Sequence, residues 1–283
     1  TEQDLQCLPA LLALDGKRVV APAHLPAVEL MQLLFFGNRR QGLTDFLLSD
    51  LGVANYFPYN IDTSQRFFVS RAAVEEYVSC GELADQYYQW QESREPASLQ
   101  QLAEHLLTVT FEHVSSARRW QRLCNRIARD LERTGELVLA LALYRRSQLH
   151  PARERSARVL EAQQAWPAAI ELCEEILADA WCEDERAAAL RMLPRLQRKA
   201  GQAATPRPRD QFAEMQLVVT RVSGSVERDT ASALASDWSQ VRYVENKLMC
   251  SLFGLAFWEE IFAAIPGAFH NPYQSVPTDM YDQ

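Results

Sequence analysis

Arginines recur every three or four residues between Ser115 and Arg133, a spacing that places them along one side of a helix. At about 100° per residue, one set falls within about 80° on a helical wheel: Arg118, Arg122, Arg126, Arg129 and Arg133, with Arg119 at the margin. The opposite side carries Trp120, Leu123, Cys124, Ile127 and Leu131, so we expect that face to be buried. Two interpretations stay open. The arginines form a phosphate-binding surface, or they form a solvated face paired with acids of a neighbouring helix.

The net charge, taken alone, argues against a nucleic-acid partner. The 283 residues carry 29 basic and 37 acidic side chains, a net charge of −8. However, the only lysines are Lys17, Lys199 and Lys247. The positive charge is therefore almost all guanidinium, whose planar fork suits phosphate, and its distribution is more informative than its sum.

Glu245 is the second candidate for a chemical role, because it stands at the start of an almost entirely apolar segment. We expect that segment to be a buried helix. An unpaired carboxylate at its entrance would cost several kcal/mol, and a metal ion or an arginine beside it would remove that cost.

The pattern predicts a mainly α protein in which residues 1–95 form a winged-helix-like DNA-binding module. Helices are expected over 27–36, 44–51 and 71–89, the last with Ser70 as its N-cap, and a short strand over 66–69. Such a module would present Arg39, Arg40, Arg66 and Arg71 to the DNA backbone. A small helical domain that docks on its neighbours is the alternative.

Residues 96–200 are predicted to form a helical-repeat region of tetratricopeptide-like character. Two segments, 132–144 and 161–173, superpose with Ala140 on Ala169 and Leu143 on Leu172. Residues 201–211 read as a linker. Residues 212–283 follow as a third region, with extended segments expected over 216–222 and 240–244 and a helix over 226–235 that Ser225 caps.

Six scattered cysteines without a CxxC pair indicate reduced thiols, mostly within the core, and the five histidines show no metal-ligand spacing. We expect no membrane span, because the longest apolar run is shorter than the roughly 20 residues that a bilayer requires. The sequence starts at Thr1 without a secretory signal, and we expect Thr1 to be a domain edge.

The last 39 residues resemble the Fanconi-associated nuclease family. The resemblance rests on Glu245, seven positions before Leu252-Phe-Gly-Leu, on Trp258 and Ile261-Phe262, and on the segment from Pro266 to Asp279, PGAFHNPYQSVPTD. The segment Leu34-Phe-Phe-Gly-Asn-Arg-Arg40 and the helical middle are also similar to this family. The resemblance implies the beginning of a VRR-type nuclease domain, an α/β restriction-endonuclease-like core of the PD-(D/E)xK class.

The resemblance also implies the activity. We expect the intact protein to be a structure-selective DNA repair nuclease that binds 5′-flap, branched and cross-linked DNA. It would hydrolyse phosphodiester bonds with Mg²⁺ or Mn²⁺, as a 5′-flap endonuclease and 5′–3′ exonuclease in interstrand cross-link repair. Glu245 matches the first catalytic and metal-binding acid. The remaining ligands, a Pro-Asp and a Glu-x-Lys, are absent from this sequence and are expected beyond Gln283.

These 283 residues are thus expected to hold the DNA-binding part, including Arg39, Arg40, Arg66, Arg71, Arg118, Arg119, Arg122 and Arg126. We do not expect hydrolysis by them alone. A homodimer on DNA, and a cytoplasmic, nucleoid-associated or nuclear location, would fit the family. The alternative is a non-catalytic helical-repeat scaffold that binds DNA or a protein.

Overall fold

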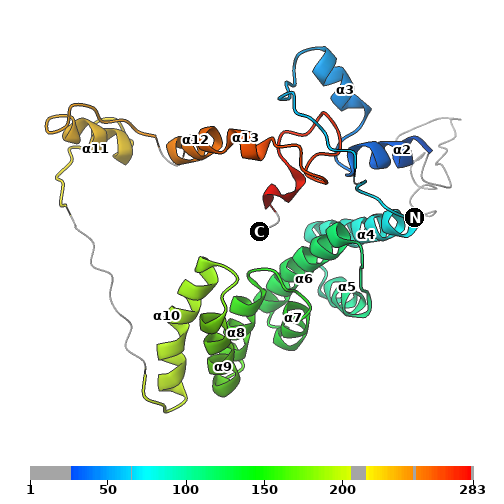
Figure 1. The fold of residues 1–283 in the computed structure, drawn as a ribbon. Helices are drawn as coiled ribbons and strands as arrows, with labels where there is room; N and C mark the ends of the chain where they lie inside the picture. The colour runs from blue at the N-terminus through cyan, green and yellow to red at the C-terminus, as the bar shows by residue number, and fades with distance from the viewer. Residues whose placement is uncertain (1–26, 65, 205–214, 245–246, 282–283) are drawn as a thin grey trace, which may run out of the picture. The chain divides into compact units, whose positions relative to one another are not determined.

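The computed structural model describes residues 27–64, 66–204, 215–244 and 247–281, and all regular secondary structure in these ranges is helical. The mainly α prediction is therefore confirmed. The contacts divide the chain into two compact units (Figure 1). The middle unit runs from Ser70 to Met215, and the terminal unit joins the described residues up to Val69 with those from Gln216 onward.

The middle unit consists of seven helices within its described residues: α4 (Arg71–Ser93), α5 (Pro96–Thr108), α6 (Val114–Thr134), α7 (Leu137–Tyr144), α8 (Ala152–Ala162), α9 (Trp166–Ala178) and α10 (Glu183–Lys199). From α6 onward each helix packs on the next one along the chain, while α4 packs on both α5 and α6. Ser70 caps α4 as predicted, since its hydroxyl accepts a hydrogen bond of 3.1 Å from Ala73 N. The core is continuous from Cys80 to Leu196.

The repeated segments occupy equivalent places in successive helix pairs. Ala140 in α7 and Ala169 in α9 are both fully buried. Glu132 lies in the last turn of α6 and Glu161 in the last turn of α8. Each accepts hydrogen bonds from an arginine two helices further along: Arg155 of α8 for Glu132, and Arg195 of α10 for Glu161. The helical prediction for this region is confirmed, and the tetratricopeptide-like description stays a prediction.

The described residues of the terminal unit form α2 (Ala27–Phe36), α3 (Leu43–Asp50), α11 (Val226–Leu234), α12 (Lys247–Ala256), α13 (Trp258–Ile261) and a short 3₁₀ helix η1 (Thr278–Tyr281). Aromatic contacts join its two halves, which are more than 200 residues apart in sequence. The Tyr273 ring lies 4.9 Å from that of Phe46 and 5.7 Å from that of Tyr56. Phe57 meets Phe262 at 4.6 Å.

The three predicted extended segments are not strands. Residues 66–69, 216–222 and 240–244 have no ladder partner in the described part of the chain, and a strand needs one to satisfy its backbone. Instead, the Phe67 ring packs 4.4 Å from the ring of His270, and Val218 is 97% exposed. The winged-helix prediction for residues 1–95 is not confirmed, because its expected strand over 66–69 does not form.

The predicted ranges 1–95, 96–200, 201–211 and 212–283 stay predictions about domains, but the contacts group the residues differently. Helix α4 belongs to the middle unit, and the third region packs with the first. Residues 205–211 of the predicted linker lie outside the described residues.

The predicted burial of the segment after Glu245 is wrong for this chain. None of the residues of α12 is buried, and Leu252, Phe253 and Leu255 are between 50% and 74% exposed. An apolar pattern indicates that a helix face can be buried by another element. Within the described residues, no element buries the apolar side chains of α12.

Among the described cysteines no disulfide forms. Cys80, Cys124 and Cys173 are buried, as expected for core thiols, Cys182 is half-buried and Cys250 is exposed. Across the described ranges, the helices all fall short of the length and apolar character that a membrane span requires.

Candidate nucleic-acid interface

Helix α6 separates its arginines from its apolar side chains, as the sequence predicts. Trp120, Leu123, Ile127 and Leu131 are buried, whereas Arg122, Arg126 and Arg133 are exposed. Gly135 ends the helix in the left-handed conformation at φ 89°, which a residue with a Cβ adopts only with strain. The helix is therefore a rigid element with one cationic face.

The arginines of α6 differ in what they contact. Near the C-terminal end, Arg129 pairs with Glu132 and Arg133 with Asp130, each at 3.0 Å. Arg119 lies over the Tyr77 ring at 5.1 Å, and Arg126 Nη1 lies 3.4 Å from the Tyr88 hydroxyl. Ion pairs are thus present on this face, and the acids of these two pairs come from α6 itself. The middle of the helix presents Arg122 and Arg126 to solvent.

An open groove of about 530 Å³ runs beside this face, between α4, α6 and the start of α8. We call it the arginine groove. Five guanidiniums line it against a single carboxylate, that of Asp130: Arg94, Arg126, Arg129, Arg133 and Arg155. The groove therefore has a cationic lining within a chain whose net charge is negative.

The remaining residues of the arginine groove are uncharged: Tyr87, Tyr88, Tyr144, Asn125, Gln91 and Pro151. Burial, and then the neighbouring Asp130, raises the pKa of Tyr87 to about 12, and its hydroxyl donates to that carboxylate at 2.6 Å. Burial and the charge of Glu132 likewise raise the pKa of Tyr144. These hydroxyls stay protonated near neutral pH, and their single protons are donated to Asp130 and Glu132. Asn125 Nδ2 donates to Leu149 O at 3.2 Å, while its buried Oδ1 has no hydrogen-bond partner.

Glu132 lies next to the groove and offsets two of its cations. Its carboxylate accepts from Arg155 Nε at 3.1 Å, pairs with Arg129 and accepts from the Tyr144 hydroxyl at 3.2 Å. Burial acts to raise its pKa, but the hydrogen bonds and charges of Arg155 and Arg129 outweigh burial and lower it. Glu132 therefore stays ionised and orients both guanidiniums.

Sequence reasoning missed Arg94 and Arg155. Arg94 caps α4 in the left-handed conformation at φ 56° and stacks over Trp90 at 4.8 Å. Arg155 belongs to α8, two helices further along the chain than α6. No periodic signal joins these residues to the arginines of α6, because only tertiary packing brings them into one groove.

The terminal unit holds a second cationic feature, the turn after α2. The Asn38 side chain organises it: its Oδ1 accepts from Arg40 N and Gln41 N, and its Nδ2 donates to Phe36 O, at 2.9–3.0 Å. Arg39 and Arg40 project from this turn and are exposed. The predicted pair thus stands on a defined backbone.

The C-terminal loop fastens this turn. Gln41 Nε2 donates to Tyr273 O at 2.7 Å, and Asn271 Nδ2 donates to Phe36 O at 3.1 Å. Gly37 has φ +67°, and a Cβ placed there would lie 3.3 Å from the ring of His270. The two segments that carry the family resemblance, Leu34–Arg40 and Pro266–Asp279, therefore contact each other directly.

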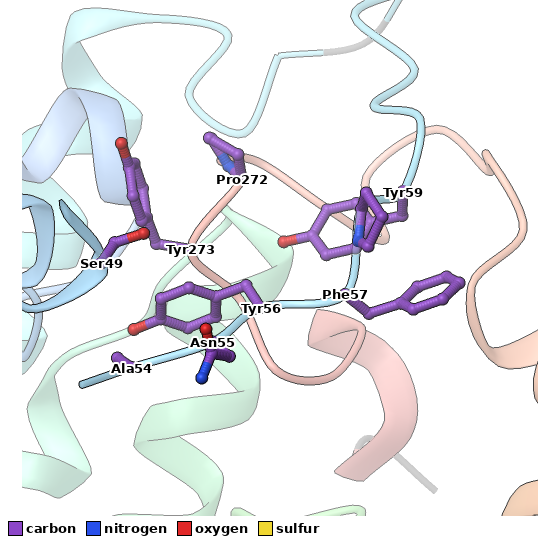
Figure 2. A pocket seen from close by; sticks show the side chains of 9 residues that line it. Ser49, Ala54, Asn55, Tyr56, Phe57, Tyr59, Pro272 and Tyr273 are labelled. Carbon is purple, nitrogen blue, oxygen red and sulfur yellow. The ribbon is translucent and has the colours of Figure 1, made fainter. Parts of the chain in front are cut away.

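A cavity of about 450 Å³ opens beside the same loop (Figure 2). We call it the aromatic cavity. Tyr56, Phe57 and Tyr59 line one side and Pro272 and Tyr273 the other, with Ser49, Ala54, Asn55 and Pro58 completing it. The Tyr59 hydroxyl donates to Asn271 O at 2.7 Å and accepts from Gln274 N at 2.9 Å, so this ring is fixed to the loop.

The other predicted site residues stand apart from these features. Arg66 is exposed, and Arg71 pairs with Glu75 at 2.9 Å on the surface of α4. Arg39, Arg40 and Arg66 belong to the terminal unit, whereas Arg71 and the α6 arginines belong to the middle unit. Glu245, the predicted catalytic and metal-binding residue, lies outside the described residues.

The residues that the structure describes do not supply a metal site. They contain no group of three or more His, Cys, Asp or Glu side chains placed to hold a metal ion. We derive no chemical step through Mg²⁺ or Mn²⁺ from this structure.

Comparison with known proteins identifies a homologue over most of this chain. The chain is 34% identical over 254 residues to the Fanconi-associated nuclease 1 homolog of Pseudomonas aeruginosa, an alignment that covers 89% of this chain. This chain is homologous to the Fanconi-associated nucleases. It spans 44% of the length of that relative. A stretch of 39 residues, 14% of the chain, is also 38% identical to the Fanconi-associated nuclease 1 homolog of Schizosaccharomyces pombe and covers 6% of it. No protein-family model matches the chain.

Solved structures of a Fanconi-associated nuclease have the same fold over most of this chain. Crystal structures of paFAN1 bound to 1nt and 2nt 5′flap DNA with gap match with TM-scores of 0.76 and 0.79 and identities of 31% and 32%. Each match covers 90% of this chain and 46% of the paFAN1 chain. The resemblance seen in the sequence is confirmed.

Proposed function

We propose that this chain is the DNA-binding part of a Fanconi-associated nuclease, and that the intact protein is a structure-selective DNA repair nuclease. The observation that carries the proposal is the arginine groove beside α6, in a fold that is similar over 90% of the chain to paFAN1 structures with bound flap DNA. Five guanidiniums in one groove provide the charge that a phosphodiester backbone requires.

The proposed ligand is 5′-flap DNA and related branched DNA. Arg122 and Arg126 are exposed in the middle of the α6 face and would contact phosphates directly. Arg129, Arg133 and Arg155 are held by acids, which fixes their orientation and lowers their net charge. Arg122 and Arg126 are expected to contribute to salt-dependent affinity through phosphate contacts.

In the intact protein the proposed reaction is metal-dependent hydrolysis of phosphodiester bonds near the junction, with Mg²⁺ or Mn²⁺, in the repair of interstrand cross-links. Glu245 would be its first metal ligand. Replacing Glu245 with alanine in the intact protein should abolish Mn²⁺-dependent cleavage of 5′-flap DNA and leave flap affinity nearly unchanged. Cleavage that survives this replacement would remove Glu245 from the active site.

A charge-neutralising variant of α6 tests the DNA-binding role. Each phosphate contact adds about 0.9 to the slope of log affinity against log salt concentration. Arg122→Gln with Arg126→Gln should therefore reduce the magnitude of this slope for flap DNA by about 1.8. Arg191→Gln with Arg198→Gln is the matched control, because these exposed arginines lie on α10, at the other end of the helix stack.

Equal slopes for the α6 variant and the α10 control would refute the assignment of α6. The alternative, a repeat scaffold that binds only proteins, would then be favoured. A scaffold that binds only proteins should show no salt-dependent affinity for flap DNA, either in the original chain or in the variants.

A further inference from the structure

The aromatic cavity of the terminal unit is not suited to phosphate binding, because none of the residues that line it is charged and four of the nine are aromatic. We propose that it holds one unpaired base of the bound DNA, stacked against Phe57. This inference rests on the proposed flap-DNA function and goes beyond it, since it assigns a base-binding site in the unit that lacks the arginine groove.

The rings of the cavity are fixed before any ligand arrives. The Tyr59 ring lies 3.9 Å from that of Phe269, and its hydroxyl is hydrogen-bonded on both sides to the C-terminal loop. Tyr273 is held edge-on between Phe46 and Tyr56. A preformed site binds with little loss of side-chain entropy, which favours a ligand that contributes only a flat apolar face.

Phe57 is the exposed ring of this set. It packs against Trp258 at 4.9 Å and Phe262 at 4.6 Å, yet it is 42% exposed. An exposed phenylalanine with its other contacts fixed is a stacking platform, and base–aromatic stacking tolerates any base because every base has a π-face. Ser49 and Asn55 add a hydroxyl and an amide that can meet the edge of a base.

The base must be unpaired. In a duplex both faces of each base are covered by its neighbours, so only a base in a flap or a gap can enter an aromatic cavity. The cavity would therefore bind the unpaired bases of flap DNA, which phosphate contacts do not distinguish from paired ones.

Aromatic grooves also bind proline-rich peptides. The similar structures contain flap DNA, which favours an unpaired base as the ligand of this cavity. Gln41 ties the exposed Arg39–Arg40 turn to Tyr273, a residue of the cavity wall. The Asp45 carboxylate is engaged by Gly42 N at 2.8 Å and by the Tyr56 hydroxyl, whose pKa burial and then this acid raise. Asp50, which follows Ser49 of the lining, is exposed, so charges of both signs lie beside the cavity.

The test compares two flap DNAs of equal charge, bound by the full chain. One carries a two-nucleotide 5′ flap, and the other carries the same flap with both bases replaced by abasic sites. Fluorescence anisotropy should show about 5- to 150-fold weaker binding of the abasic flap, equivalent to the roughly 1–3 kcal/mol that one stacked base contributes. Phe57→Leu, which keeps an apolar side chain but removes the ring face, should bring this ratio towards one.

Trp238→Leu is the matched control, because it removes a 63% exposed ring of the terminal unit that does not line the cavity. This variant should keep the full ratio. Equal affinity for both flaps in the original chain would overturn the proposed base site and leave the phosphate-binding function standing. Loss of binding to both flaps would instead refute the proposed function, and the base site with it. A proline-rich peptide that binds the chain but not Phe57→Leu, together with equal flap affinities, would reassign the cavity to a protein ligand.

Discussion

Replacing Glu132 with glutamine should weaken the fold and strengthen DNA binding at the same time. Glu132 and Arg155 are only 16% and 15% exposed, and the carboxylate also pairs with Arg129. Glutamine keeps the shape but removes the charge that these guanidiniums contact. Hydrogen bonds to charged groups contribute about 1.5–3 kcal/mol, so the free energy of unfolding should fall by about that amount at pH 7.

The effect on DNA has the opposite sign, because the same change releases two cations at the arginine groove. If both Arg129 and Arg155 then reach phosphate, the salt slope for flap DNA should rise by up to about 1.8. Urea denaturation measures the first effect, and anisotropy between 50 and 200 mM salt measures the second at concentrations where the variant stays folded.

Glu161→Gln is the matched control. Glu161 has the equivalent position at the end of α8, where Arg195 and Lys199 of α10 contact it. It should therefore destabilise the chain without changing DNA affinity. A Glu132→Gln variant that is folded but binds flap DNA with an unchanged or smaller slope would refute the assignment of the groove to phosphate.

The pH dependence of this stability difference follows from the lowered pKa of Glu132 in the folded chain. A carboxyl group with a lowered folded pKa contributes its stability fully above its unfolded pKa of about 4.3 and loses it as pH falls through the folded value. The difference in unfolding free energy between the original chain and Glu132→Gln should therefore shrink as pH falls below about 5. A difference that stays constant down to pH 3 would contradict the ion-pair account.

Three further predictions concern other parts of the chain. Gly37→Ala should lower stability by at least the roughly 1–2 kcal/mol of a strained left-handed residue. It should cost more than Gly52→Ala, which has the same φ of +67° but an open surrounding, and urea denaturation of both tests this. Burial lowers the pKa of His270, so the stability of the chain should fall as pH drops through its unfolded pKa of about 6.5 and level off below the folded pKa. This pH dependence should be absent in His270→Phe. Burial raises the pKa of the Cys124 thiol to about 12, whereas Cys250 is exposed. Cys250→Ser should therefore remove one fast-reacting thiol in a thiol-labelling assay of the folded chain, and Cys124→Ser none.

The sequence predicts α6 well because its information is local. Arginines at i, i+4 and i+8 and an apolar opposite face determine which side of one helix is buried, and the structure has this division. Caps at Ser70 and Ser225 are local in the same sense, and both accept the expected backbone hydrogen bond.

The features that the sequence did not predict depend on contacts between distant residues. The arginine groove needs Arg94 and Arg155 beside α6, and the aromatic cavity needs Tyr56 beside Tyr273, more than 200 residues away. The strand predicted over 66–69 failed for the same reason: aromatic and β-branched residues favour a strand, but Phe67 finds His270 and not a partner strand. The apolar pattern of α12 also gave the wrong burial, because a pattern does not show whether a covering element is present.

The most direct test of the central claim is the affinity of the full chain for a 5′-flap DNA and for a blunt duplex of the same length at one salt concentration. We expect tighter binding of the flap. The logarithm of the flap affinity should fall linearly with log salt concentration, with a shallower slope in Arg122→Gln with Arg126→Gln. Equal affinities for both DNAs, in the non-specific range of about 10⁻⁴–10⁻⁶ M, would contradict it.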